Sequence, residues 1–277
     1  MKPRRALTAA GSVALGLVVL LWSFAPVYNM LLIALDPDEG EIEFSGHLWP
    51  PEPSLESFGV VFTGSERYLE HFWRQFGNSL AIGIGTMLLT VLVASLASFA
   101  AGRMRARRGA LLANASLLTY VIPSAFLIVP FHRVMDTYGI SNSPWAVIAA
   151  YAAFATPFAI LILRHYATLI PADLDDAARV DGASSVQVYR RVYLPLMAPA
   201  LAVVATYALV LAWNDYLYQF VLLSSERHMT AAVMQAQLFD DADAPWNAMM
   251  AAAIVYSLPP VAIFFVLRRY LGAGRIQ

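Results

Sequence analysis

The stretch Asp173–Leu196, DLDDAARVDGASSVQVYRRVYLPL, is polar, although long apolar segments lie on both sides of it. Asp173 stands where a helix cap is expected, because a carboxylate is stabilised at the positive end of the helix dipole. Gly182 lies where a glycine can take the left-handed conformation that ends a helix. Ser184 and Gln187 have the spacing of a capping box. The stretch therefore predicts two short helices joined by an elbow.

The segments around this elbow have the composition of membrane helices. Of the 277 residues, 59% are hydrophobic and 13% are charged, and the mean hydropathy is +0.60. A soluble domain has about a quarter charged residues. Apolar runs of about twenty residues are long enough to cross a bilayer as helices. We predict an all-α integral membrane protein with six spans, over residues 7–35, 78–102, 110–131, 144–165, 196–222 and 247–267.

The basic residues predict the orientation of these spans. Eighteen lysines and arginines are present; all but Arg67, Arg74, Arg133 and Arg227 lie on the side of the elbow and of the two termini, residues 1–6 and 268–277. The positive-inside rule therefore places the termini and the elbow in the cytoplasm. The loop 36–76 is then periplasmic. Its aromatic end, SERYLEHFWRQF, predicts a helix on the membrane surface, which either anchors the next span or docks an outside partner.

Composition also excludes several classes of function. The chain has no cysteine, which removes disulfides, thiol catalysis and cysteine-bound metals. Its lysine count is one, at Lys2, so no phosphate-binding loop of the G-x-x-x-x-G-K-[ST] type is present and any ATP must be bound by another chain. A net charge of -1 gives no field for nucleic acid. We expect no catalytic residue, no cofactor and no metal ligand in this chain.

The spacing D-A-A-x-x-x-G-x(9)-V-x-L-P, from Asp176 to Pro195, resembles the EAA loop of permease subunits in binding-protein-dependent ABC importers. FGNSLAIG, LAWNDYLYQFVLL and PWNAMMAAAIVYSLPPVAIFFVLRRYL are similar to segments of the maltose-type carbohydrate permeases. The resemblance implies the ABC type I importer permease fold, with the transmembrane domain over 72–268 and a coupling loop over 173–195. One departure is Asp176, which replaces the usual glutamate and has a shorter reach.

The same resemblance implies how the elbow works and which proteins it meets. A pair of ATPase subunits binds ATP and Mg, and the elbow of each permease sits in a cleft on its ATPase. A paralogous permease subunit and a periplasmic or extracellular solute-binding protein complete the importer in the bacterial inner membrane. The coupling candidates are Asp176, Ala177, Ala178, Gly182, Val192, Leu194 and Pro195. Locally, Asp175 and Arg179 have i,i+4 ion-pair spacing. The plainer interpretation is a well-capped loop that only links two spans.

A second group of polar residues, in WNDYLYQ at 213–219, lies within a predicted span. Ionisable groups at membrane depth are costly and are functional candidates by default. Aromatic rings stack on the apolar faces of sugars, and amides and carboxylates bond sugar hydroxyls. The substrate-path candidates are Trp213, Asn214, Asp215, Tyr216 and Tyr218. The alternative is that Asn214 and Asp215 pack against the partner permease or break the helix near the outer surface.

We therefore predict a permease subunit, and not an enzyme, for import of a carbohydrate or polyol. Glycerol phosphate is an alternative solute, although no cluster of arginines lies at membrane depth to bind a phosphate. An ion-coupled secondary transporter would need ion sites in related repeats, and Asp215 is the one candidate carboxylate. A membrane enzyme is disfavoured because neither a G-x-S-x-G motif nor a pair of intramembrane carboxylates is present.

Overall fold

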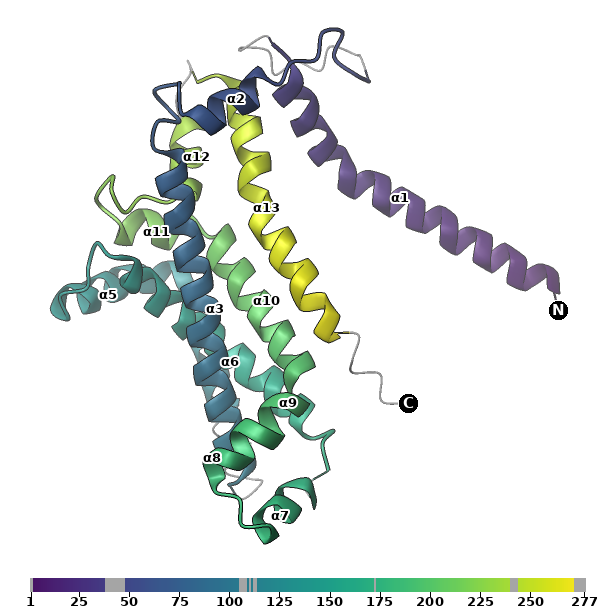
Figure 1. Ribbon diagram of the computed structural model, residues 1–277, viewed down its shortest axis with the longest axis vertical. Coiled ribbons are helices and arrows are strands. Elements are labelled where there is room, and N and C mark those ends of the chain that lie inside the picture. The colour runs from purple at the N-terminus through teal and green to yellow at the C-terminus, as the bar shows by residue number, and fades with distance from the viewer. Residues whose placement is uncertain are drawn as a thin grey trace. The chain divides into compact units, whose positions relative to one another are not determined.

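The computed structural model describes residues 2–37, 48–104, 109, 111, 114–171, 173–239 and 244–271. These residues form helices joined by turns, and no strand occurs among them, so the predicted all-α class is confirmed (Figure 1). The chain divides into two units. The first contains residues 1–72 and 237–257, and the second contains residues 73–236 and 258–277.

The first unit contains α1 (Lys2–Leu35), α2 (Glu56–Thr63) and the first part of α13 (Trp246–Leu271). The Ser54 N–H donates to the Leu35 carbonyl at 2.8 Å, and the Asn247 amide donates to the Asp36 carbonyl at 3.2 Å. These bonds satisfy backbone carbonyls at the end of α1, which the helix itself leaves without partners.

The aromatic end of the loop 36–76 does not form the separate surface helix that the sequence predicts. Residues 67–71 lie in turns, and α3 begins directly at Phe72. The loop instead contains α2, which the sequence analysis did not predict. Gly64 ends α2 in the left-handed conformation, at φ 65°, and turns the chain away from the helix axis. Trp73 and Phe76 therefore belong to the first turns of α3.

The second unit holds both groups of candidate residues. It contains all of α3 (Phe72–Gly102) except its first residue, most of α12 (Ala231–Phe239) and the last part of α13. The elements between α3 and α12 are, in chain order, η1 (Leu117–Val121), α5 (Ser124–Thr137), α6 (Pro144–Ala167), α7 (Asp173–Val180), α8 (Ser185–Val188), the π-helical η2 (Tyr189–Tyr193), α9 (Leu194–Leu196), α10 (Ala198–Asn214) and α11 (Leu217–Leu222). The ribbon shows α7 and α8 at one end of α3 and α10, and α11 toward the other end (Figure 1).

Small residues allow these helices to pack closely. α10 packs along α6, and the buried residues between α3, α6 and α10 include Ala94, Ala159, Ala200 and Val204. At Gly85 of α3, an added Cβ would lie 2.6 Å from Ile148 Cδ1. Membrane helices gain stability from this close approach, because lipid supplies no hydrophobic force between them.

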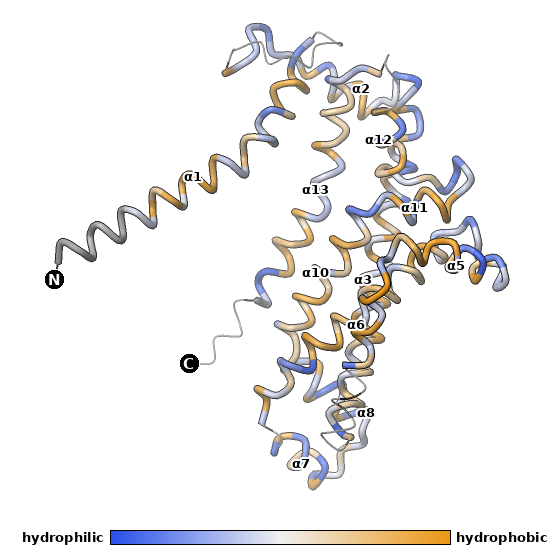
Figure 2. Tube along the Cα trace, turned by 180° about the vertical axis from the view of Figure 1, so that it is seen from behind, coloured by the Kyte–Doolittle hydropathy of each residue, from blue (hydrophilic) through white to orange (hydrophobic). Residues whose placement is uncertain are grey.

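Four helices in the described residues are long and apolar enough to cross a membrane: Gly11–Leu35, Phe72–Gly102, Pro144–Ala167 and Trp246–Tyr270. Two bent pairs of helices bring the number to six if each pair is one span. Figure 2 shows hydrophobic residues along α6 and α10. The number of spans agrees with the prediction of six on that condition.

The two remaining predicted spans, 110–131 and 196–222, are not single straight helices. In the first, Asn114–Val121 and Ser124–Thr137 meet at 99°. Pro123 causes this bend, since it has no N–H to donate and forces Ile122 into an extended conformation. The second begins with a bend of 79° between Ser185–Leu196 and α10, and α10 ends at Asn214, before α11.

Candidate functional site

The elbow between α7 and α8 has the local structure that its sequence predicts. Gly182 has φ 82°. Its N–H donates to the Arg179 carbonyl at 3.0 Å, and the Ala183 N–H donates to the Ala178 carbonyl at 3.0 Å. This pair of bonds is a Schellman motif, in which a left-handed glycine ends the helix and satisfies its last carbonyls.

The second arm of the elbow begins at a capping box. The Ser184 N–H donates to Gln187 Oε1 at 2.7 Å, and the Gln187 N–H donates to Ser184 Oγ at 3.4 Å. At the other end of the elbow, α7 begins at Asp173, so this residue lies in the first turn and not before it. Apart from this shift, the turn between α7 and α8 has the local hydrogen bonds that the sequence predicts.

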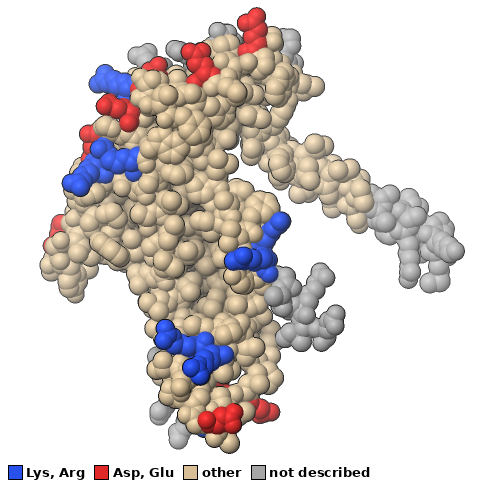
Figure 3. Space-filling model, viewed as in Figure 1, with Lys and Arg blue, Asp and Glu red and all other residues tan. Residues whose placement is uncertain are grey.

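The coupling candidates divide by exposure. Asp176, Ala177, Gly182 and Pro195 are exposed, whereas Ala178, Val192 and Leu194 are half-buried. A Cβ added at Gly182 would meet no heavy atom within 4 Å, so this part of the elbow is open backbone. Figure 3 shows basic and acidic side chains together at the end of the molecule where α7 and α8 lie. The elbow thus presents charged groups together with the exposed side chains of Leu174, Val180 and Val186, and open backbone at Gly182.

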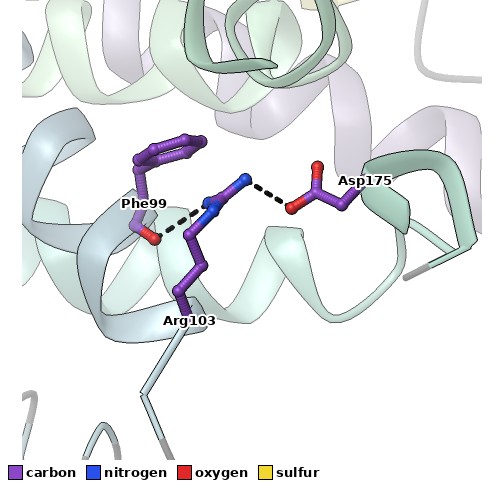
Figure 4. A network of polar contacts seen from close by, with 3 residues as sticks. All are labelled: Phe99, Arg103 and Asp175. Carbon is purple, nitrogen blue, oxygen red and sulfur yellow. Dashed lines mark hydrogen bonds and ion pairs between the residues drawn. The ribbon is translucent and has the colours of Figure 1, made fainter. Parts of the chain in front are cut away.

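Asp175 has a partner that its spacing did not indicate. Its carboxylate forms an ion pair with Arg103, just after the end of α3, and not the predicted i,i+4 pair with Arg179 (Figure 4). Burial lowers the pKa of Arg103 from its ordinary value, and the neighbouring Asp175 opposes that effect. Since arginine titrates far above neutral pH, the guanidinium stays charged.

The helix break after α10 is built from hydrogen bonds within the chain. Asp215 is extended, with φ −81° and ψ 133°, and its Oδ1 accepts a bond of 3.0 Å from the Tyr218 N–H at the start of α11. The Gln219 amide donates to the Ala212 carbonyl at 2.8 Å and to the Asp215 carbonyl at 2.6 Å. Backbone groups freed by a break in a membrane helix need such partners, because lipid offers none.

A cavity of about 180 Å³ lies beside this break. It is lined in part by Tyr120, Tyr151, Asp215 and Tyr218. The Tyr151 hydroxyl donates to Asp215 Oδ1 at 2.7 Å, and the Tyr218 hydroxyl donates to the Ser124 carbonyl at 2.5 Å. Tyr120 donates to the Phe154 carbonyl at 2.5 Å. The cavity therefore combines aromatic rings with one carboxylate and three phenolic groups.

The structure does not bring the five substrate-path candidates together. Asp215 and Tyr218 line the cavity, whereas Asn214 lines a separate groove of about 510 Å³ along α10. Tyr216 is exposed and stacks on Phe220. Trp213 is buried, and its ring meets that of Phe76 edge to face.

Sequence reasoning missed three residues that organise these sites. Gln219 carried a signal, since it is an amide inside a predicted span, four residues after Asp215. Arg103 is the first basic residue after its span, which marks it as interfacial but does not name its partner. Tyr151 gave no signal, because a tyrosine in an apolar helix is common. Among the described residues, no cluster of three or more His, Asp or Glu side chains could hold a metal.

Comparisons with known proteins cover both the elbow and the cavity. Residues 91–276 match the family described as binding-protein-dependent transport system inner membrane component. The chain is 30% identical to the inner membrane ABC transporter permease protein YcjP of Escherichia coli (strain K12), over 94% of this chain and 91% of the relative. It is 29% identical to the trehalose transport system permease protein SugB of Mycobacterium tuberculosis (strain CDC 1551 / Oshkosh), over 93% and 92%.

The fold is similar to that of a chain in the crystal structure of a bacterial ABC transporter involved in the import of the acidic polysaccharide alginate. The TM-score is 0.77 and the sequence identity is 21%, over 98% of each chain.

Proposed function

The chain belongs to the family of binding-protein-dependent transport system inner membrane components, and from this premise we propose that it is the permease subunit of an ATP-driven importer of a carbohydrate or polyol. Family membership and several apolar helices make it a multi-pass membrane subunit of a transport system. The predicted ABC type I importer permease fold is confirmed by the similarity to the alginate transporter chain.

The observation that carries the proposal is the exposed elbow of α7 and α8. A charged, well-capped elbow with open backbone at Gly182 suits a cleft on another protein. The proteins that we propose to carry this cleft are a pair of ATPase subunits, which bind ATP and Mg. Closure of the pair on ATP would then rotate the membrane helices as rigid bodies. The coupling surface comprises the exposed Asp176, Ala177, Gly182 and Pro195, supported by the half-buried Ala178, Val192 and Leu194.

The solute class rests on relatives and on the cavity. SugB is named for trehalose transport, and the similar structure belongs to a transporter of the polysaccharide alginate. The cavity beside Asp215 offers tyrosine rings for stacking, and hydroxyl and carboxylate groups for hydrogen bonds. We assign Asp215 and Tyr218 to the solute path. A paralogous permease subunit would complete the path, and a periplasmic or extracellular solute-binding protein would deliver the solute.

The first prediction tests this function in the native host. Affinity purification of the tagged chain is expected to bring an ATPase subunit pair and a second permease. The elbow is proposed to bind the ATPase, and the apolar helices are proposed to pack against the second permease. Deletion of the chain should abolish uptake of one neutral sugar or polyol in a labelled panel, and re-expression should restore it. Loss of glycerol phosphate uptake instead would favour that solute. Purification without any ATPase, together with uptake that follows an ion gradient, would contradict the importer.

A second prediction concerns orientation, since both termini and the elbow are proposed to be cytoplasmic and loop 36–76 periplasmic. The chain has no cysteine, so a single introduced cysteine is the one thiol in it that a reagent can label. Ser65 and Ser185 are both exposed. A membrane-impermeant thiol reagent on intact cells, with the outer membrane permeabilised, should label Ser65→Cys but label Ser185→Cys only after lysis. Labelling of Ser185→Cys before lysis would reverse the orientation.

A further inference from the structure

One face at the end of α3 contacts both arms of the elbow. Ser95, Phe99 and Arg103 are spaced by four residues, so their side chains follow one line along the helix and just past its end. Ser95 is buried, Phe99 is half-buried, and Arg103 is partly buried, with 22% of its side chain exposed. We call these three residues the α3 stripe.

The first arm, α7, meets the stripe at Arg103. One terminal guanidinium nitrogen bonds the Asp175 carboxylate, and the other donates to the Phe99 carbonyl at 3.1 Å (Figure 4). The guanidinium carbon also lies 3.3 Å from the centre of the Phe99 ring, within reach of a cation–π interaction. Three contacts thus hold the Arg103 side chain in one position and direct it at α7.

The second arm, α8 and η2, meets the stripe at Ser95 and Phe99. The hydroxyls of Ser95 and Tyr189 are 2.8 Å apart, which is a hydrogen bond. The Phe99 ring lies edge to face with Tyr189 at 5.0 Å and with Tyr193 at 5.1 Å. These rings form a packed contact that joins the second arm to α3, independently of the ion pair.

The two arms differ in how firmly packing holds them. No residue of α7 is buried, whereas Val188 and Tyr193 of the second arm are. Apolar packing therefore holds the second arm on α3, whereas the polar contact between α7 and the stripe is the Arg103–Asp175 pair. The pair borders a cavity of about 160 Å³.

We propose that the α3 stripe is the point at which movement of the elbow passes into the membrane helices, and that Arg103 is the positioning residue that ties α7 to it. This proposal rests on the function proposed above, because it assumes an ATPase that moves the elbow. Without the ion pair, only the second arm still joins the elbow to α3, so less of the ATPase movement reaches the membrane helices.

The test uses the whole importer, reconstituted with its ATPase and binding protein. Arg103→Ala is expected to assemble normally and to keep basal ATPase activity, while solute transported per ATP falls by about 2- to 30-fold, the range for residues that couple distant sites. Asp175→Ala should act in the same way. The charge swap Arg103→Asp with Asp175→Arg should recover transport per ATP to within about threefold of the native value, because it restores the pair.

Arg133→Ala is the matched control, since Arg133 is an exposed arginine of α5 far from the elbow in sequence; it should leave transport per ATP unchanged. The proposal is overturned if Arg103→Ala keeps native transport per ATP, or if both single variants fail and the swap does not recover. Failure of the native chain to bring an ATPase would instead overturn the function itself. A thermal-unfolding measurement of each variant in detergent separates loss of coupling from loss of fold.

Discussion

Gly182→Val is expected to abolish solute uptake and to lower the amount of copurified ATPase, while the chain still inserts in the membrane. Gly182 has φ 82°, a conformation that costs a β-branched residue roughly 1–3 kcal/mol. α7 has no buried residue to oppose that strain, so the elbow changes shape before any spanning helix does. Uptake of the cognate solute and the ratio of ATPase to permease after purification measure the effect.

The chain supplies a close control at Gly139. This glycine also has a positive φ, 68°, lies in open space, and ends α5 through the same pair of backbone bonds, from the Gly139 N–H to Asp136 and from the Ile140 N–H to Met135. Gly139→Val therefore introduces similar strain away from the elbow and should retain ATPase binding. Gly182→Asn tests whether the backbone conformation at residue 182 is what the elbow requires, because asparagine tolerates the left-handed conformation. Equal loss of ATPase in both valine variants, or normal uptake in Gly182→Val, would contradict the coupling role of the elbow.

Asp215→Asn is expected to weaken solute binding in the membrane by roughly 1–3 kcal/mol, about 5- to 150-fold, the scale of one charge-assisted hydrogen bond. The variant keeps an oxygen that can accept the bonds from the Tyr151 hydroxyl and the Tyr218 N–H. Assembly and basal ATPase activity should therefore survive. The measurements are the concentration dependence of uptake, the ATPase rate and the copurified partner permease, made on one preparation.

Tyr151→Phe separates the binding of solute by Asp215 from the part that Asp215 plays in the helix break. It removes one bond to Asp215 Oδ1 but leaves the carboxylate charged and the α11 cap in place, so uptake should change less than in Asp215→Asn. Loss of the partner permease in Asp215→Asn would show instead that Asp215 is a contact between subunits. Native transport kinetics in that variant would remove Asp215 from the solute path.

The sequence by itself determined the class of the fold and the form of the elbow, because both depend on local chemistry. Apolar runs of membrane length specify helices wherever the chain meets lipid. The Schellman motif at Gly182 and the capping box at Ser184 use bonds between residues at most five positions apart, so their residue types are enough to predict them.

The partners of the polar groups were decided by the tertiary structure. Asp175 has Arg179 within one helical turn, yet its ion pair is with Arg103, 72 positions away, because helix packing brings the end of α3 beside α7. The hydroxyl that bonds Asp215 comes from Tyr151, 64 positions away on α6. Such contacts depend on which helices lie together. Helix faces made of small and apolar residues can pack against one another in many combinations. Only the packed structure selects one of them.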